Sequence, residues 1–303
     1  MIGNITFLND GNNYGQRLQL YAIQRFFLLK FGERVTTLDI FRDRNSVNLE
    51  DDTMFHRFER ECLDLIVPRK DDFDALSECS RIILGGDQML NNGFIRKLGY
   101  LDYITRRTRP LKNVFAYSAG LDGSHSLDEE TVRLLGPHMI AYGTREPCVI
   151  LQHVMVVDPV FLDKEEFIGI GADYCGGRHG HRVTYRRMRP GMPQKELYFE
   201  TGKFGCQLMS GDDLHVPDPR DFLGLMYGAD SIETDMFHGV ALGLLFNVPN
   251  IKVVGAVDHR ISNLLDVLGV DFSGCRVVNY RDVNARMERL RGKSIEFIEK
   301  CMA

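Results

Sequence analysis

The 303-residue sequence has no apolar run that approaches the roughly 20 residues needed to span a bilayer, so no transmembrane segment is predicted. Its start lacks a basic stretch followed by a long apolar region, which argues against a secretion signal and favours a cytoplasmic protein. The seven cysteines occur singly and without a CxxC pair, which predicts neither a disulfide framework nor a zinc knuckle. With a net charge of -5 there is no basic excess, so no nucleic-acid partner is expected.

Motifs for common cofactors are also missing. The sequence contains neither the GxGxxG pattern of dinucleotide-binding proteins nor the GxxxxGK(S/T) pattern of P-loop proteins. It has no HExxH motif, and His179 and His181 are too close together in the chain to be persuasive as a metal pair. Asp158, which precedes Pro159, is interpreted as a turn former rather than a ligand. We therefore predict neither a metal nor a cofactor.

Short apolar runs of strand length alternate with stretches of helical period, which predicts an α/β fold with a mostly parallel sheet. The expected strands are 5–8, 35–40, 81–84, 113–117, 139–142 and 154–157, followed by 167–171, 207–210, 231–234, 251–254 and 276–278. Helices are expected after Pro217-Asp218-Pro219 and after Val257-Asp258. We predict two α/β domains, residues 1–160 and 161–303, and a last helix, 294–302, able to pack back on the first domain.

In open α/β sheets ligands bind beyond the carboxyl ends of the strands, so the loops after the predicted strands are candidate sites. Glycines and polar residues fill two of these loops, around Asn13 to Gln16 and around Gly85 to Gln88. Exposed N–H groups at the start of a helix can hold an anion. Such glycine-rich turns also arise from turn chemistry alone.

Two side chains in further loops could carry chemistry. His238 is expected in the first turn of a helix, where an imidazole can transfer protons, and its alternative role is to cap that helix and fill space. Arg145 follows an apolar strand and offers a guanidinium fork for a carboxylate or phosphate. Its alternative role is a salt bridge with Glu146 or another neighbour.

A series of segments resembles the polysaccharide pyruvyl transferase family, in the order of that family and between residue 9 and about residue 270. The segments are NYGQRLQLYAIQ (13–24), IILGGDQMLN (82–91), AYSAG (116–120), TRE (144–146), VDPV (157–160), TDMFHG (234–239) and RISNLL (260–265). The resemblance implies two Rossmann-like domains that face each other across a cleft, similar to the GT-B glycosyltransferase arrangement, with the active site in that cleft.

The resemblance also implies an enzyme that transfers a pyruvyl group from phosphoenolpyruvate to two hydroxyls of a sugar, giving a cyclic ketal in surface polysaccharide or exopolysaccharide biosynthesis. The acceptor would be nucleotide-linked, lipid-linked or polymeric, and a lipid-linked acceptor is compatible with peripheral membrane contact. His238 and Arg145 are the catalytic residues that it implies. The expected substrate-binding residues are Asn13, Tyr14, Gly15, Gln16, Gly85, Gly86, Asp87, Gln88, Thr234, Asp235, Met236, Phe237, Gly239 and Arg260.

One position departs from the family pattern. Met236 stands where many members carry an arginine, in a TDRLH-like motif. A replacement cation could come from the stretch Arg178 to Arg189, interpreted either as a mobile basic flap or as a solvated loop. Arg260 is a second candidate, and its alternative role is a salt bridge with Asp258 or Asp266.

Two other functions stay open. The first is a GT-B-type glycosyltransferase that uses a nucleotide sugar, because the fold would look alike. The second is a non-catalytic descendant that only binds glycan, which the methionine at position 236 would favour.

Overall fold

The chain forms two compact units. The computed structural model describes residues 1–8, 13–39, 54–67, 74, 78–86, 88–93, 95, 101, 104, 113–121, 126–149, 152–186, 197–200, 217–255, 257–271 and 279–303. Unit 1 comprises Met1–Leu162 together with Arg289–Ala303, and unit 2 comprises Asp163–Glu288. The sequence-based boundary was placed between residues 160 and 161, and the contacts within the chain divide it after Leu162.

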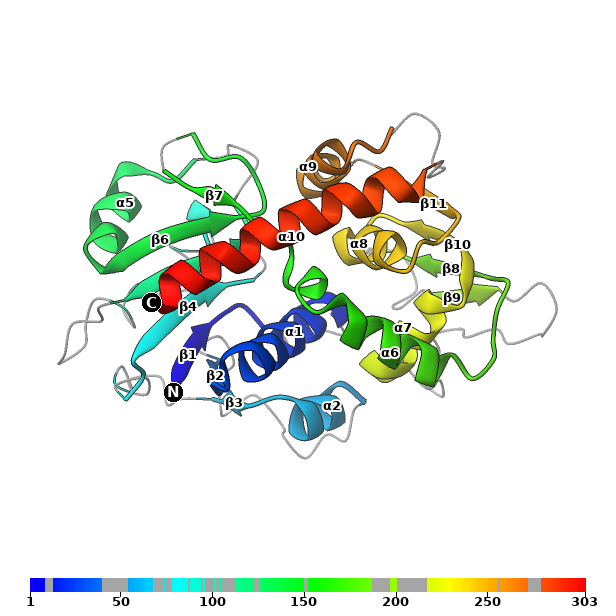
Figure 1. Ribbon diagram of the computed structural model, residues 1–303, viewed down its shortest axis with the longest axis horizontal. Helices are drawn as coiled ribbons and strands as arrows, with labels where there is room; N and C mark the ends of the chain where they lie inside the picture. The colour runs from blue at the N-terminus through cyan, green and yellow to red at the C-terminus, as the bar shows by residue number, and fades with distance from the viewer. Residues whose placement is uncertain are drawn as a thin grey trace. The chain divides into compact units, whose positions relative to one another are not determined.

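Unit 1 is built on a seven-stranded sheet in the order β3-β2-β1-β4-β5-β6-β7 (Figure 1). Its strands are β1 (Ile2–Ile5), β2 (Val35–Leu38), β3 (Leu65–Ile66), β4 (Arg81–Gly85), β5 (Val114–Ala119), β6 (Met139–Thr144) and β7 (Val154–Met155). Every pairing among them is parallel. The strands β1, β2 and β5 are buried along their whole length, as expected where a parallel sheet is covered on both faces.

The helical elements of unit 1 begin and end at recognisable signals. They are α1 (Tyr14–Phe31), α2 (Met54–Cys62), α5 (Glu129–Leu135), the short 3-10 helices η1 (Gly136–His138) and η2 (Pro159–Phe161), and the second part of α10 (Tyr280–Met302). The side chain of Asn13 caps α1 by accepting a hydrogen bond from the N–H of Gln16. Gly32 ends this helix with a left-handed backbone, φ 65°.

Unit 2 has a smaller, four-stranded sheet in the order β11-β10-β8-β9. Its elements are α6 (Lys164–Cys175), β8 (His181–Tyr185), β9 (Leu197–Glu200), α7 (Pro219–Tyr227), β10 (Ala229–Thr234), α8 (Phe237–Leu245), β11 (Asn250–Val253), α9 (His259–Leu268) and the first part of α10. The pairs of β10 with β8 and with β11 are parallel, and β8 pairs with β9 in antiparallel fashion. Helix α8 contacts β10 and β11, so it covers the part of the sheet that these two strands form.

The structure confirms a mixed α/β chain with a mainly parallel sheet. Strands expected at 35–40, 81–84, 113–117, 139–142, 154–157, 231–234 and 251–254 correspond to β2, β4, β5, β6, β7, β10 and β11, and the helices expected after Pro219 and after Asp258 correspond to α7 and α9. The first strand lies at Ile2–Ile5 rather than at 5–8. The strands expected at 207–210 and 276–278 lie outside the described residues.

Two interpretations of unit 2 were wrong. The run 167–171 is part of helix α6, in which Phe167, Gly171 and Cys175 are buried at a spacing of four, the period of a helix face. The side chain of Asp163 caps the start of this helix. This capping residue is a sequence signal for a helix, whereas the short apolar run that follows it also fits a strand. Within the supposed basic flap, residues 181–185 form strand β8 at the interior of the sheet, so this part is neither a flap nor a loop.

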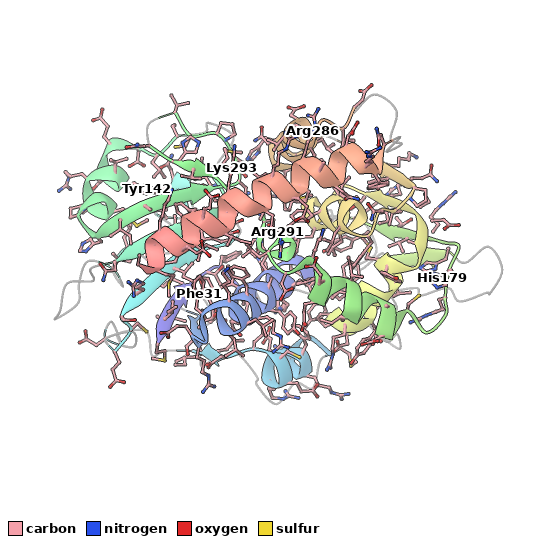
Figure 2. All side chains as sticks on the ribbon, viewed as in Figure 1. Phe31, Tyr142, His179, Arg286, Arg291 and Lys293 are labelled. Atoms are coloured by element: carbon pink, nitrogen blue, oxygen red, sulfur yellow. The ribbon has the colours of Figure 1, made fainter. Side chains whose placement is uncertain are left out.

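The C-terminal helix α10 is much longer than predicted, because Ser294 lies inside it rather than at its start. In unit 1, Phe297 fits against Gly143, where a Cβ would lie 2.8 Å from the phenylalanine ring. Arg291, labelled on α10 in Figure 2, donates from Nε to the carbonyl of Leu162 at 2.7 Å. Helix α10 therefore contributes both apolar and polar contacts to unit 1. Among the described residues, no helix combines the length and apolar character needed to cross a bilayer.

Glycines in α6 and α7 provide a test of the packing of unit 2. A Cβ on Gly224 would stand 2.4 Å from the backbone of Tyr174, whereas a Cβ on Gly169 would meet nothing within 4 Å. We expect Gly224→Ala to destabilise unit 2 by about 1–3 kcal/mol, because two backbones would have to separate. Gly169→Ala should stabilise it by up to about 1 kcal/mol through helix propensity. Urea unfolding of both variants measures this, and an unchanged midpoint for Gly224→Ala would contradict the packing of α6 on α7.

Candidate functional site

The start of α1 is mostly buried. Tyr14 and Gln16 are 0% and 3% exposed, and Gly15 is buried between them. The Tyr14 ring packs on Phe55 of α2 with 4.7 Å between the ring centroids. Asn13 is half-buried and serves as the cap of the helix. This segment was expected to contact substrate. In the structure Tyr14 has a role in packing, and Asn13 has a role in capping α1.

The next residues of α1 reinforce this packing. Arg17 is 1% exposed, and its Nε donates to Glu59 of α2 at 2.9 Å. Its guanidinium carbon also lies 5.2 Å from the centre of the Phe55 ring. A buried guanidinium needs such a partner, because an unpaired charge is strongly disfavoured away from water. Arg17 therefore joins α1 to α2.

Arg145 follows directly after β6 and is held by a buried carboxylate. Its Nη1 donates to Oδ2 of Asp158 at 2.6 Å, and the two side chains are 4% and 0% exposed. Gln19 of α1 donates to the same Oδ2 at 2.5 Å. The other carboxylate oxygen accepts the N–H of Val160 and so caps η2. Asp158 is thus a turn former, as expected, and also the ion-pair partner of Arg145, which the sequence did not indicate.

Glycines let the backbone approach Arg145 closely. A Cβ on Gly120 would stand 3.0 Å from Nη2 of Arg145 and 3.0 Å from the backbone nitrogen of Gln88. The N–H of Gly120 donates to the carbonyl of Gly86 at 3.3 Å. Gly86 has φ 93°, a conformation that side chains rarely adopt, and a Cβ there would stand 2.4 Å from the hydroxyl of Thr6. The carboxyl ends of β4, β5 and β6 therefore meet around Arg145.

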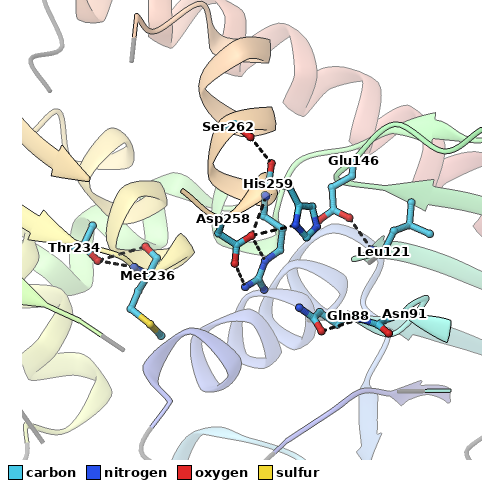
Figure 3. A network of polar contacts seen from close by, with 10 residues as sticks. Gln88, Asn91, Leu121, Glu146, Thr234, Met236, Asp258, His259 and Ser262 are labelled. Carbon is cyan, nitrogen blue, oxygen red and sulfur yellow. Dashed lines mark hydrogen bonds and ion pairs between the residues drawn. The ribbon is translucent and has the colours of Figure 1, made fainter. Parts of the chain in front are cut away.

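Figure 3 shows further polar contacts of unit 1 at this edge. Oε2 of Glu146 accepts the N–H of Leu121 at 2.7 Å, and the carboxylate is fully buried. The side-chain amide of Asn91 donates to Oε1 of Gln88 at 3.1 Å. Gly85 ends β4, and Asp87 lies outside the described residues. The edge thus gathers Gly85, Gly86, Gln88 and Arg145 from the sequence-based set of site residues.

His238 lies in the first turn of α8, as predicted, two residues after the cap residue Met236. Its side chain is 6% exposed, and its ring packs edge-on against Phe237 at 5.1 Å. The hydroxyl of Thr234 accepts the N–H of Met236 at 3.0 Å, which closes a tight turn from β10 into α8 (Figure 3). A Cβ on Gly239 would lie 2.3 Å from that hydroxyl, so only glycine lets the helix sit this close to the strand.

Met236 takes the position at which the family pattern often has arginine. Its side chain makes no capping hydrogen bond to α8. Asp235 and Met236 are both half-buried, between the fully buried Thr234 and the buried Phe237. The turn thus has no cationic side chain of its own. The partial positive charge at this place comes from the N–H groups at the start of α8.

Arg260 forms the salt bridge with Asp258 that was one of its two alternatives. Its Nη2 donates to Oδ2 of Asp258 at 2.6 Å, and its Nε to Oδ1 at 3.0 Å, while Asp258 also caps α9 (Figure 3). Burial alone would raise the pKa of Asp258, but the hydrogen bonds and charge of Arg260 outweigh it and hold the pKa well below its ordinary value.

The same arrangement occurs at α7, where Asp218 caps the helix and pairs with Arg220 two residues later. The Asp-x-Arg pattern is thus a helix-capping device used twice in unit 2. This capping pattern explains the orientation of Arg260, and no bound ligand is needed to explain it.

The predicted site residues fall into separate sets within the units. Arg145 lies in unit 1, whereas His238 and Arg260 lie in unit 2. No sequence pattern marks Gln19 or Asp158 as a site residue. The spacing of Arg145 and Asp158 gives no local signal of their contact, because the intervening residues leave and re-enter the sheet.

Among the described residues, no three His, Cys, Asp or Glu side chains gather so that they could hold a metal ion. No protein-family model matches this sequence, and neither does any curated protein with which it was compared.

The ion pair of Arg145 can be tested with Asp158→Asn, which keeps an oxygen to cap η2 but removes the charge. We expect a loss of about 3–5 kcal/mol, because a buried guanidinium loses its counter-ion. The control is Lys30→Gln, which breaks a pair with Glu299 whose side chains are 44% and 45% exposed. Lys30→Gln should lower the free energy of unfolding by at most about 1 kcal/mol. Equal urea midpoints for the two variants would contradict a buried ion pair.

The Asp258–Arg260 pair predicts a dependence on pH. A carboxyl whose pKa is lower in the folded state contributes stability above its unfolded pKa, about 3.9, and loses it as pH falls toward the folded pKa. The stability difference between the wild type and Arg260→Gln should therefore be largest near neutral pH and shrink below about pH 4. Urea unfolding at several pH values measures it, with Asp258→Asn as the control that removes the titrating group. A difference that stays constant down to low pH would refute this assignment.

Proposed function

We propose that the protein is a pyruvyl transferase that uses phosphoenolpyruvate as donor and a sugar as acceptor. The resemblance of the TDMFHG and TRE segments to the polysaccharide pyruvyl transferase family motivates the proposal. The observation that carries it is the position of His238, in the first turn of α8 just beyond the carboxyl end of β10. Ligands of open α/β sheets bind at this edge, and the start of a helix favours an anion.

The proposed reaction requires groups that transfer protons. A proton must be added to the methylene carbon of phosphoenolpyruvate, and one sugar hydroxyl must lose its proton as its oxygen attacks C2. A second hydroxyl then attacks C2 as phosphate leaves, and the proton of this hydroxyl is passed to the departing phosphate, which gives the cyclic ketal and hydrogen phosphate. An imidazole can both donate and accept a proton, so His238 is assigned the acid/base role.

The donor carries a phosphate and a carboxylate, so its site needs cationic groups or helix starts. In this proposal the N–H groups at the start of α8 supply the anion contact of unit 2. Arg145, which Asp158 holds in its orientation, supplies the anion contact of unit 1. The acceptor would be nucleotide-linked, lipid-linked or polymeric, and the product would belong to surface polysaccharide or exopolysaccharide biosynthesis in the cytoplasm.

The test is phosphate release from phosphoenolpyruvate with a panel of nucleotide sugars, lipid-linked sugars and glycans, combined with mass analysis of the acceptor. His238→Ala should lower kcat by about 100- to 10,000-fold, the usual contribution of a general acid or base. The control is His179→Ala, since His179 is exposed and precedes the amino end of β8, the opposite edge of the parallel β8–β10 pair. This control should retain full activity.

Other outcomes favour the alternatives. Release of a nucleotide from an activated sugar, without consumption of phosphoenolpyruvate, would replace the proposal with a glycosyltransferase. Glycan binding without turnover of any donor, unchanged in His238→Ala, would support the non-catalytic alternative. Equal activity of His238→Ala and the wild type would remove the imidazole from the mechanism.

A further inference from the structure

Ser118 lies at an irregularity near the end of the central strand β5. In the pairing of β5 with β6, Ala116 is opposite Tyr142 and Ala119 is opposite Thr144. Two residues of β5, Tyr117 and Ser118, therefore face one residue of β6, which is the definition of a β-bulge. Bulges are enriched next to active sites, because they change the direction of a side chain.

The backbone at Ser118 is strained. Its φ is 54°, in the left-handed region that non-glycine residues rarely adopt. Among the described residues, the other non-glycine positions with positive φ are Gln88, Asn113 and Asn247. Asparagine tolerates this conformation well, which leaves Gln88 and Ser118 as the unusual positions.

The strained residue Gln88 lies next to the stretch of chain that follows Ser118. The backbone nitrogen of Gln88 lies 3.0 Å from the Cβ position of Gly120, and Gly120 is two residues after Ser118. Nη2 of Arg145 lies at the same distance from that position. Strain at a functional site persists where the surrounding structure imposes it, so an observed outlier of this kind motivates a search for function.

The hydroxyl of Ser118 adds a second unfavourable feature. Ser118 is 0% exposed, and its Oγ has no hydrogen-bond partner among the described residues. A buried polar group without a partner is disfavoured and calls for an explanation such as a ligand or an internal water. Ser294 of the same unit is also 0% exposed, but it donates to the carbonyl of Leu290 and accepts the N–H of Val157. Only one of these two buried serines is satisfied by the fold.

We propose that the Ser118 hydroxyl is a ligand contact in a small oxyanion site at the carboxyl edge of unit 1, where it donates a hydrogen bond to a carboxylate or phosphate oxygen. Nη2 of Arg145 lies 3.0 Å from the Cβ position of Gly120, two residues after Ser118, and a guanidinium on this stretch of chain favours an anion over a neutral ligand. This inference rests on the proposed function only for the identity of the anion, the carboxylate or phosphate of phosphoenolpyruvate. Because Ser118 has no exposed area, binding requires neighbouring atoms to move locally.

The experiment compares Ser118→Ala and Ser118→Gly with Ser294→Ala in the full chain. Isothermal titration with phosphoenolpyruvate, pyruvate and inorganic phosphate measures affinity, and urea unfolding measures stability. Both Ser118 variants should bind the anion about tenfold more weakly, which corresponds to about 1.4 kcal/mol. Neither should lose stability, and Ser118→Gly should gain it because glycine relieves the strained φ. Ser294→Ala should unfold at lower urea and keep its affinity within about twofold, since it loses internal bonds only.

Several results would separate this inference from the proposed function. Phosphoenolpyruvate binding that is unaffected in Ser118→Ala, together with a loss of stability like that of Ser294→Ala, would overturn the Ser118 site and indicate an internal water. Binding of inorganic phosphate or pyruvate that depends on Ser118, without binding of phosphoenolpyruvate, would support the site and remove the proposed donor. A wild-type protein that binds none of the three anions would overturn the site.

Discussion

The buried carboxylate of Asp158 connects much of the carboxyl edge of unit 1. One of its oxygens accepts hydrogen bonds from Gln19 of α1 and from Arg145 after β6, and the other caps η2. In an interior of low polarity a guanidinium is tolerated only with such a partner. The orientation of Arg145 is therefore fixed by the folded structure, and a group that is held in place loses less conformational freedom on binding a ligand.

The start of α8 and the end of β5 differ in how their polar groups are hydrogen-bonded. At the start of α8, Thr234 closes the turn with its hydroxyl and Gly239 removes the side chain that would hinder it. At the end of β5, Ser118 combines a strained backbone with a buried hydroxyl that has no partner among the described residues. At the first edge the turn from β10 into α8 is therefore closed by the residues of the turn itself. The second holds unfavourable features that a bound oxyanion would offset.

Repetition of one local pattern separates capping from binding in unit 2. Arg260 lies in a segment that resembles the polysaccharide pyruvyl transferase family, but its bonds to Asp258 have the same form as those of Arg220 to Asp218. A guanidinium that reaches back to the carboxylate of a helix cap stabilises the start of the helix wherever the pattern occurs. The Asp-x-Arg motif therefore has a structural cause at both helices, and the proposed function assigns the chemistry to His238 and Arg145.

Local patterns in the sequence determined the alternation of strands and helices, the start of α9 after Asp258 and the position of His238 in the first turn of α8, because each depends on residues a few positions apart. They failed at residues 167–171, where a short apolar run fits a strand as well as a buried helix face. Only the tertiary structure decided that Asp158 pairs with Arg145, and that Ser118 is buried without the bonds that Ser294 makes. Such contacts depend on how the strands and helices pack together, and no spacing along the chain encodes them.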